Sequence, residues 1–195
     1  MLTLTPQNTG WIEVVCGPMF GGKTEELMRR LRRAEIAKQK VVIFKPKTDN
    51  RFNNDHIVSH DQNKLSSLQV KSSKEILKHS CDAEVVGIDE AQFFDKSLVS
   101  IVKELARSGK RVIIAGLDKD FMGNAFGPMA ELLIEAEYIT KTLSICVRCG
   151  NPANYSYRIS KDTRQIVVGE KDTYEARCRK CFEGEKETKK NLRFA

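Results

Sequence analysis

The segment from Gly17 to Thr24 reads G-P-M-F-G-G-K-T and fits the phosphate-loop pattern G-x-x-x-x-G-K-T. An apolar run, 12–16, precedes it and a helix-forming stretch follows it, which is the strand–loop–helix order that the pattern requires. In such a loop the backbone N–H groups and the first turn of the helix form a concave site for phosphate oxygens. This context favours a nucleoside triphosphate site over a chance match.

Two side chains of this loop have predicted roles of their own. Lys23 would reach the β- and γ-phosphates, and the Thr24 hydroxyl would bind Mg²⁺. The predicted phosphate-binding residues are Gly17, Pro18, Met19, Phe20, Gly21, Gly22, Lys23 and Thr24.

Two adjacent carboxylates follow a second apolar run, 85–88. An acid at the end of a strand is the usual second element of a phosphate-loop site, so Asp89 is expected to hold Mg²⁺ directly or through water. Glu90 would face a second substrate as a general base, although it could instead cap a following helix. If Glu90 orients water the chain is an ATPase, and if it takes a proton from a substrate hydroxyl the chain is a small-molecule kinase. The length of 195 residues favours the kinase.

Four of the six cysteines form two C-x-x-C pairs, Cys146 with Cys149 and Cys178 with Cys181. Paired C-x-x-C units predict a tetrahedral Cys₄ zinc site, with redox-active or surface thiols as the alternatives. The 28 residues between the pairs are a candidate lid over the γ-phosphate, which a kinase must shield from water. The other two cysteines, Cys16 and Cys81, lie beside apolar runs and are expected to be buried.

Composition indicates one ordinary domain with a small appendage, since 41% of the residues are hydrophobic and 30% are charged. The sequence has no apolar window of the length that a membrane span needs, and residues 1–10 do not resemble a secretory signal. We therefore expect a cytoplasmic protein with no membrane partner.

The net charge is +7, and residues 146–195 hold 12 Lys and Arg against 7 Asp and Glu. No basic block with interleaved aromatics accompanies them, so the sequence does not favour a nucleic-acid partner.

The elements that must position these groups alternate between strands and helices. Four near-continuous apolar runs predict strands covered on both faces, at 12–16, 41–44, 85–88 and 112–115. Helical spacing of apolar residues predicts three helices: one with Leu27, Leu31 and Ala34 on its buried face, one with Leu98, Ile101, Val102 and Leu105, and one from about Pro128 to Tyr138. The arginines of the first helix, Arg29, Arg30, Arg32 and Arg33, are expected to form a solvated face.

This alternation predicts a parallel α/β sheet flanked by helices, with the active site at the carboxyl ends of the strands. We expect residues 45–73 to be a loop. After Cys146 the pattern changes, and two short strands are expected at 155–159 and 165–168, held by the cysteines. The predicted division is an α/β domain, 1–142, and a C-terminal zinc-binding domain, 143–195.

Several motifs together resemble those of the type II (cytosolic, zinc-containing) thymidine kinases, over about residues 10–181. Besides the phosphate loop and the cysteine pairs, the matching pieces are Glu26-Leu-Met-Arg-Arg30, Asp49-Asn-Arg51, Ile88-Asp-Glu-Ala-Gln-Phe-Phe94, Leu117-Asp-Lys-Asp-Phe121 and Phe126-Gly127. The resemblance implies a RecA-like P-loop fold with a zinc ribbon, and transfer of the γ-phosphate of ATP to the 5′-hydroxyl of thymidine or deoxyuridine, with Mg²⁺, giving dTMP for nucleotide salvage. It also implies a homotetramer and feedback inhibition by dTTP.

The same resemblance assigns roles to individual residues. Glu90 becomes the catalytic base and Asp89 the acid on the metal side, while Asp49, Arg51 and Gln92 lie on the phosphate side. The thymine pocket would include Met19, Phe93, Leu117, Phe121, Phe126 and Tyr174, and a lasso loop would close over the base through Gln165, Ile166, Val167, Val168 and Gly169. Aromatic and apolar walls suit a flat base, although packing in the core is the alternative for each aromatic side chain.

Two positions depart from the family pattern. Gly21 stands where the loop usually has serine, and Glu170 stands where a second glycine often follows the lasso.

Two other functions compete with the kinase. One is a P-loop ATPase that acts on nucleic acid through a zinc ribbon, and the other is a non-catalytic nucleotide-binding adaptor.

Overall fold

The structure of the protein is a computed structural model, which describes residues 9–47, 67–160 and 173–184. Its larger part is a six-stranded sheet in the order β3-β2-β4-β5-β1-β6, in which every neighbouring pair is parallel. The strands are β1 (Trp11–Gly17), β2 (Val41–Pro46), β3 (Leu68–Val70), β4 (Val85–Ile88), β5 (Arg111–Leu117) and β6 (Tyr138–Lys141). The predicted parallel α/β fold is therefore confirmed.

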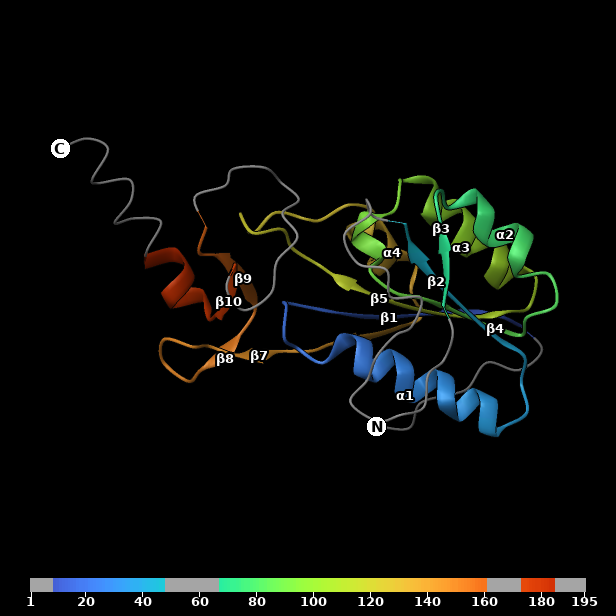
Figure 1. Cartoon of the computed structure of the whole chain (residues 1–195), viewed down its shortest axis with the longest axis horizontal. Coiled ribbons are helices and arrows are strands. Elements are labelled where there is room, and N and C mark those ends of the chain that lie inside the picture. The colour runs from blue at the N-terminus through green and yellow to red at the C-terminus, as the bar shows by residue number, and fades with distance from the viewer. Residues whose placement is uncertain (1–8, 48–66, 161–172, 185–195) are drawn as a thin grey trace.

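Helices cover both faces of this sheet (Figure 1). On one face α1 (Lys23–Ile36) packs its buried side chains, among them Leu27 and Leu31, against β1, β2, β4 and β5. On the other face lie α2 (Lys74–His79), α3 (Ser97–Arg107) and α4 (Met129–Glu135), with a short 3₁₀ turn, η1 (Ala91–Phe93), between β4 and α3. The runs in β1, β4 and β5 are buried because each of these strands is covered from both sides, whereas Val41 and Val42 of β2 are partly buried.

Strand order brings the predicted chemistry to one edge of the sheet. β5 lies between β1, which leads into the phosphate loop, and β4, which leads into Asp89. All three strands run in the same direction, so their carboxyl ends meet at the same edge. In register, Gly17 lies opposite Leu117.

The C-terminal part is built from two small antiparallel ribbons. β7 (Ser144–Ile145) pairs with β8 (Pro152–Ala153), and β9 (Tyr155–Arg158) pairs with β10 (Tyr174–Arg177). Residues 179–184 are helical and follow β10 directly (Figure 1). The first predicted strand of this region is confirmed as β9, whereas the one predicted at 165–168 lies outside the described residues.

Three expectations about secondary structure and burial were wrong in part, and two elements were not expected. Residues 45–73 are not all loop, because β2 extends to Pro46 and β3 pairs beside it. The third helix ends at Glu135 rather than near 138, since the chain must become extended there for β6 to pair with β1. Strand β6 and the short helix α2 had no counterpart in the predicted elements. Cys16 is buried as expected, but Cys81 is exposed.

The arginines of α1 are not all solvated either. Arg30 is largely buried, and its guanidinium bonds Glu13 on β1 at 2.7 Å, Glu26 at 2.8 Å and Thr140 on β6 at 2.8 Å. Glu13 is buried as well, and it also accepts hydrogen bonds from Arg111 at 2.6 Å and from the Trp11 indole at 2.8 Å. This ion-pair network fastens α1, and with it the phosphate loop, to the sheet.

In the part of the chain that the structure describes, no helix has both the length and the apolar character that crossing a membrane requires.

Candidate functional site

The phosphate loop is a tight turn between β1 and α1. Gly17 closes β1 with φ 147°, and a Cβ at this position would lie 2.4 Å from the backbone oxygen of Thr142, so no larger residue fits. Phe20 and Gly22 have φ values of 61° and 74°, both in the left-handed region, and α1 begins at Lys23. Backbone strain at a non-glycine residue such as Phe20 is typical of a ligand-binding turn.

Lys23 lies at the centre of this loop. Its Nζ donates a hydrogen bond to the Pro18 carbonyl at 2.7 Å. Burial lowers the pKa of Lys23 below its ordinary value, although the nearby carboxylates of Glu90, Asp89 and Asp118 act in the opposite direction. A desolvated ammonium among these acids is a strong partner for an anionic phosphate.

Thr24 and Asp89 meet at the rim of the loop. The Thr24 hydroxyl lies 3.3 Å from both carboxylate oxygens of Asp89, and Lys45 Nζ lies 3.5 Å from one of them. Burial and the neighbouring charge of Glu90 raise the pKa of Asp89 to about 6, against the opposing effects of Lys45 and Lys23. A carboxylate whose charge is this poorly compensated, next to a hydroxyl, fits the oxygen donor set that Mg²⁺ prefers.

Glu90 follows Asp89 in a left-handed backbone conformation, with φ 55° and ψ 39°. Its N–H donates to Asp89 Oδ1 at 3.0 Å, and its carboxylate accepts a hydrogen bond from Gln92 Nε2 at 2.5 Å. A glutamate held in this sparsely populated conformation indicates a residue that the surroundings fix for function. The bond to Gln92 sets the direction of its side chain.

Gln92 is the link between the ends of β4 and β5. It is fully buried, and its Oε1 accepts a hydrogen bond from the Leu117 backbone N–H at 2.9 Å. Gly127 lies against its backbone, since a Cβ there would come within 2.2 Å of the Gln92 carbonyl oxygen. Sequence reasoning placed Gln92 on the phosphate side, and the structure shows it bonded to Glu90 and Leu117.

The aromatic residues predicted for the nucleoside pocket fall into two groups. Phe93 and Phe126 form an edge-to-face pair with ring centroids 5.5 Å apart, just beyond Gln92. Phe121 and Tyr174 are joined through Arg158, whose guanidinium carbon lies 3.7 Å from the Phe121 centroid and whose nitrogens donate to the Tyr174 hydroxyl.

Two further residues lie among these predicted ones and were missed from the sequence. Ser156 is buried, and its hydroxyl accepts a hydrogen bond from the Met19 backbone N–H of the phosphate loop at 2.9 Å. Arg158 is also buried. Their alternation with Tyr155 and Tyr157 is a strand signal that puts both on one face, and this signal alone could have found them.

Some predicted site residues lie outside the described residues. They are Asp49 and Arg51 on the phosphate side and Gln165, Ile166, Val167, Val168 and Gly169 of the lasso.

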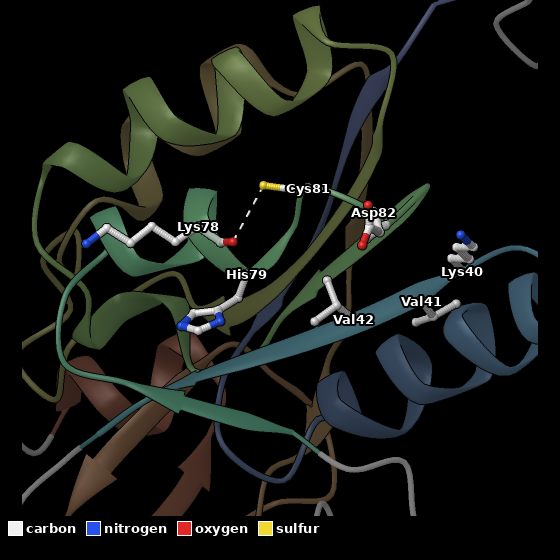
Figure 2. Close-up of a pocket in the computed structure, with 8 residues that line it drawn as sticks. Lys40, Val41, Val42, Lys78, His79, Cys81 and Asp82 are labelled. Carbon is white, nitrogen blue, oxygen red and sulfur yellow. Dashed lines mark hydrogen bonds between the residues drawn. The ribbon is translucent and has the colours of Figure 1, made fainter.

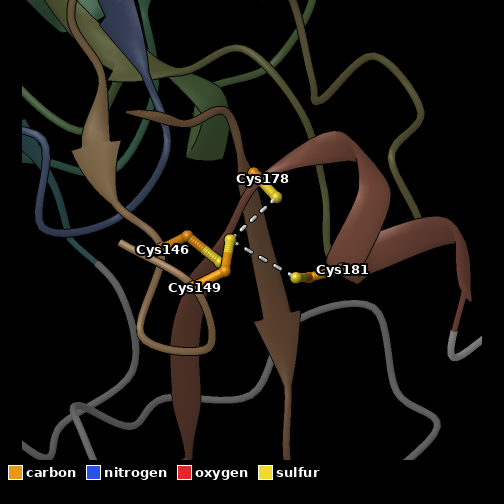
Figure 3. Close-up of side chains that lie close together, drawn as sticks. All are labelled: Cys146, Cys149, Cys178 and Cys181. Carbon is orange, nitrogen blue, oxygen red and sulfur yellow. Dashed lines mark hydrogen bonds between the residues drawn. The ribbon is translucent and has the colours of Figure 1, made fainter. Parts of the chain in front are cut away.

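The four paired cysteines converge, as the spacing predicted (Figure 3). Their sulfur atoms all lie within 4.8 Å of one another, and Cys149 Sγ is 3.6 Å from the Sγ atoms of both Cys178 and Cys181. A tetrahedral zinc site with bonds of about 2.3 Å has sulfur–sulfur edges of about 3.8 Å, so the cluster fits zinc closely.

The thiols of this cluster are also electronically suited to a metal. Burial raises the pKa of Cys146, but hydrogen bonds from the backbone N–H groups of Cys178, Arg148 and Cys149 outweigh it and lower the pKa to about 6. Hydrogen bonds with the sulfurs of Cys149 and Cys178 raise the pKa of Cys181 to about 12. Such a cluster needs a cation to become fully deprotonated.

A surface hollow of about 240 Å³ lies at the opposite end of the sheet, near the start of β2 (Figure 2). It is lined by Lys40, Val41, Val42, Lys78, His79, Cys81, Asp82 and Ala83. The exposed Cys81 sulfur points at the carbonyl of Lys78, 3.5 Å away. This mixed-charge surface contains none of the predicted site residues.

Known proteins of one family are similar to this chain over most of its length. The sequence model described as thymidine kinase matches residues 10–182. A thymidine kinase from Rhodothermus sp. (strain ITI 518) is 53% identical over 176 residues, which cover 90% of this chain and 83% of that protein. Thymidine kinases from Bacteroides thetaiotaomicron and Bacteroides fragilis are 50% and 51% identical over 173 and 174 residues, covering 89% of this chain and 87% of each relative.

Proposed function

This chain belongs to the thymidine kinase family, and on that premise we propose that it transfers the γ-phosphate of ATP to the 5′-hydroxyl of thymidine, and of deoxyuridine, giving dTMP in the case of thymidine. The observation that carries the proposal is the arrangement at one sheet edge of Lys23, Asp89 and Glu90. Lys23 would bind a phosphate, Asp89 would face the metal, and Glu90 would face the hydroxyl that is phosphorylated.

In the mechanism that we propose, the 5′-oxygen attacks the γ-phosphorus in line while Glu90 orients it and accepts its proton. Because phosphoryl transfer proceeds through a loose transition state, orientation matters more than strong basicity. The hydrogen bond from Gln92 supports this role, since it holds the carboxylate in one direction. Lys23 would offset the charge that spreads over the phosphate oxygens. Mg²⁺, held by Thr24 and Asp89, would supply further positive charge when bound, and Arg51 is expected to contribute as well.

The substrate and metal assignments that go beyond the family name are parts of the same proposal. Met19, Leu117, Phe93, Phe121, Phe126 and Tyr174 would line the thymine pocket, and residues 165–169 would close over the base. A structural zinc ion in the Cys₄ cluster would hold the C-terminal ribbons together. dTTP would inhibit by occupying the nucleoside site, and the location would be cytoplasmic.

A homotetramer is also proposed. Its support is that β6 is an edge strand, bonded to β1 alone within the described sheet. The apolar side chains of Ile139 on β6 and Ile134 on α4 are more than half exposed. An apolar sheet edge of this kind is suited to an interface between copies.

The test is phosphate transfer from γ-labelled ATP to a panel of nucleosides, with zinc content measured on the same sample. We expect label to appear on thymidine and deoxyuridine and not on the purine nucleosides. ATP turnover that rises with DNA and is indifferent to thymidine would instead indicate the nucleic-acid ATPase.

A further inference from the structure

Strand β9 has two chemically different faces. Tyr155 and Tyr157 lie on one face, where the Tyr155 ring stacks on Phe182 with centroids 4.3 Å apart and the Arg177 guanidinium carbon lies 3.4 Å from the Tyr157 centroid. The intervening residues, Ser156 and Arg158, must point the other way. That opposite face meets the phosphate loop at Met19 and the segment after β5 at Phe121.

Arg158 makes its contacts on this second face. Its guanidinium carbon lies 3.7 Å from the centroid of the Phe121 ring, so the two groups are in close contact. Its Nε and Nη2 donate to the Tyr174 hydroxyl at 3.1 and 2.7 Å. Tyr174 is directly opposite Arg158 in the β9–β10 register, which places both side chains on the same face.

Burial makes these contacts strong. Arg158 is 6% exposed and Tyr174 is 8% exposed. A desolvated guanidinium gains more from an aromatic ring than an exposed one does, and its rigid fork of donors fixes the group it binds. Arg158 therefore joins two rings, one from the α/β part of the chain and one from the C-terminal ribbon.

We propose that Arg158 is the positioning residue of the nucleoside pocket, which sets the separation of Phe121 and Tyr174 so that a pyrimidine base fits between the pocket walls. This inference rests on the proposed function, because it is that function which makes the two rings walls of a pocket. Arg158 acts through the rings and leaves the phosphate loop and Glu90 in place.

The first test is the Arg158→Met variant in full-length, zinc-loaded protein. We expect the KM for thymidine to rise about ten- to hundredfold, as when a binding group is misplaced by about 1 Å, with kcat and the KM for ATP within about twofold of the wild type. Arg158→Lys keeps the positive charge but loses the planar guanidinium group and its fixed set of N–H donors. It should therefore not restore the thymidine KM. It is also the milder change, and gives the measurement if the methionine variant does not fold.

The second test is a double-mutant cycle with Tyr174→Phe, which keeps the ring and removes only the hydroxyl. If Arg158 acts through Tyr174, the double variant Arg158→Met/Tyr174→Phe should raise the thymidine KM by less than the product of the two single effects. Fully multiplicative effects would contradict positioning through this hydroxyl.

Arg179→Met is the matched control. Arg179 lies in the same part of the chain, 5.6 Å from the Tyr155 centroid, but it is exposed and contacts the tyrosine face of β9. Its thymidine KM should equal that of the wild type. A folded Arg158→Met enzyme with unchanged thymidine KM, or with KM for ATP raised equally, overturns the inference. By contrast, wild-type protein that does not phosphorylate thymidine overturns the proposed function itself.

Discussion

The Gln92 amide nitrogen lies 2.5 Å from the Glu90 carboxylate, and the oxygen of the same amide accepts the Leu117 backbone N–H at 2.9 Å. One buried side chain thus ties the residue proposed as the base to the end of β5. Since β5 is flanked by the strands that carry the phosphate loop and Asp89, Glu90 is held in register with both. The hydrogen bond from Gln92 sets the direction of its carboxylate.

Glu90→Gln should abolish most of the turnover while leaving binding intact. Loss of a general base costs roughly 10²–10⁴ in kcat, and the shape of glutamine preserves the pocket. Steady-state kinetics and equilibrium binding of thymidine measure the two effects separately. Glu104→Gln, an exposed residue on α3, is the control and should be fully active. A Glu90→Gln enzyme with near-normal kcat would remove Glu90 from the mechanism.

Gln92→Met should lower both activity and stability. The Leu117 N–H would lose its acceptor, which costs about 1–3 kcal/mol for a buried group. Glu90 would lose the donor that directs it, so we expect kcat to fall about tenfold or more. Chemical denaturation and kinetics on the same preparation give the two values, and Gln69→Met on the exposed part of β3 is the comparison. A stability loss without any change in kcat would show that Gln92 is only structural.

Cys178→Ser should lose zinc and weaken thymidine binding more than ATP binding. Cys178 directly follows β10, so loss of the metal loosens the ribbon that carries Arg158 and Tyr174, whereas α1 and the phosphate loop are held by the sheet. Metal analysis with the two KM values measures this. Cys81→Ser, which changes the exposed cysteine outside the cluster, should keep its zinc. If the zinc-free variant kept full thymidine affinity, the nucleoside pocket would not depend on the metal.

Glu13→Gln should destabilise the fold and change its response to acid. Burial by itself raises the pKa of Glu13, but hydrogen bonds from Arg111 and Trp11 and the charges of Arg111 and Arg30 outweigh it and lower the pKa below its ordinary value of 4.5. A group with a lowered pKa contributes stability that is complete above its unfolded-state value and is lost as the pH falls through its folded-state value. Removing the charge takes away the carboxylate that pairs with Arg111, whereas Arg30 keeps its ion pair with Glu26, so we expect a loss of about 1–3 kcal/mol near neutral pH.

The corresponding measurement is the free energy of unfolding from about pH 7 to about pH 3. Wild-type stability should fall below about pH 4.5, and Glu13→Gln should lack that part of the slope. The exposed Glu131→Gln on α4 should follow the wild-type curve. Identical acid dependence in the wild type and in Glu13→Gln would argue against the network.

Local sequence was enough to predict the central strands, the phosphate loop and the Asp89–Glu90 pair. β1, β4 and β5 are buried on both faces and β2 is partly buried, so each contains a run of apolar residues that can be recognised from the sequence alone. β3 has three residues, of which Leu68 and Gln69 are exposed. It is therefore too short to show the alternation of buried and exposed side chains that identifies a strand. The phosphate loop and the Asp89–Glu90 pair are contiguous motifs and were found for that reason.

Contacts between distant segments were beyond the sequence. Ser156 and Met19 are 137 residues apart, and no pattern in either segment predicts the hydrogen bond between them. The same holds for Glu13, where a lone acid inside an apolar strand shows its arginine partners only after α1 and β5 have packed around it.

The two-faced strand β9 restricts how this part of the chain can evolve. Substitutions at Tyr155 or Tyr157 act on one face and leave the other unchanged. Insertion or deletion of a single residue, however, would turn the side chains beyond it to the opposite face, moving the arginine away from Phe121 and Tyr174 and putting a tyrosine in its place. Lineages that retain the activity are therefore expected to vary freely in the residues of this ribbon before they vary in its length.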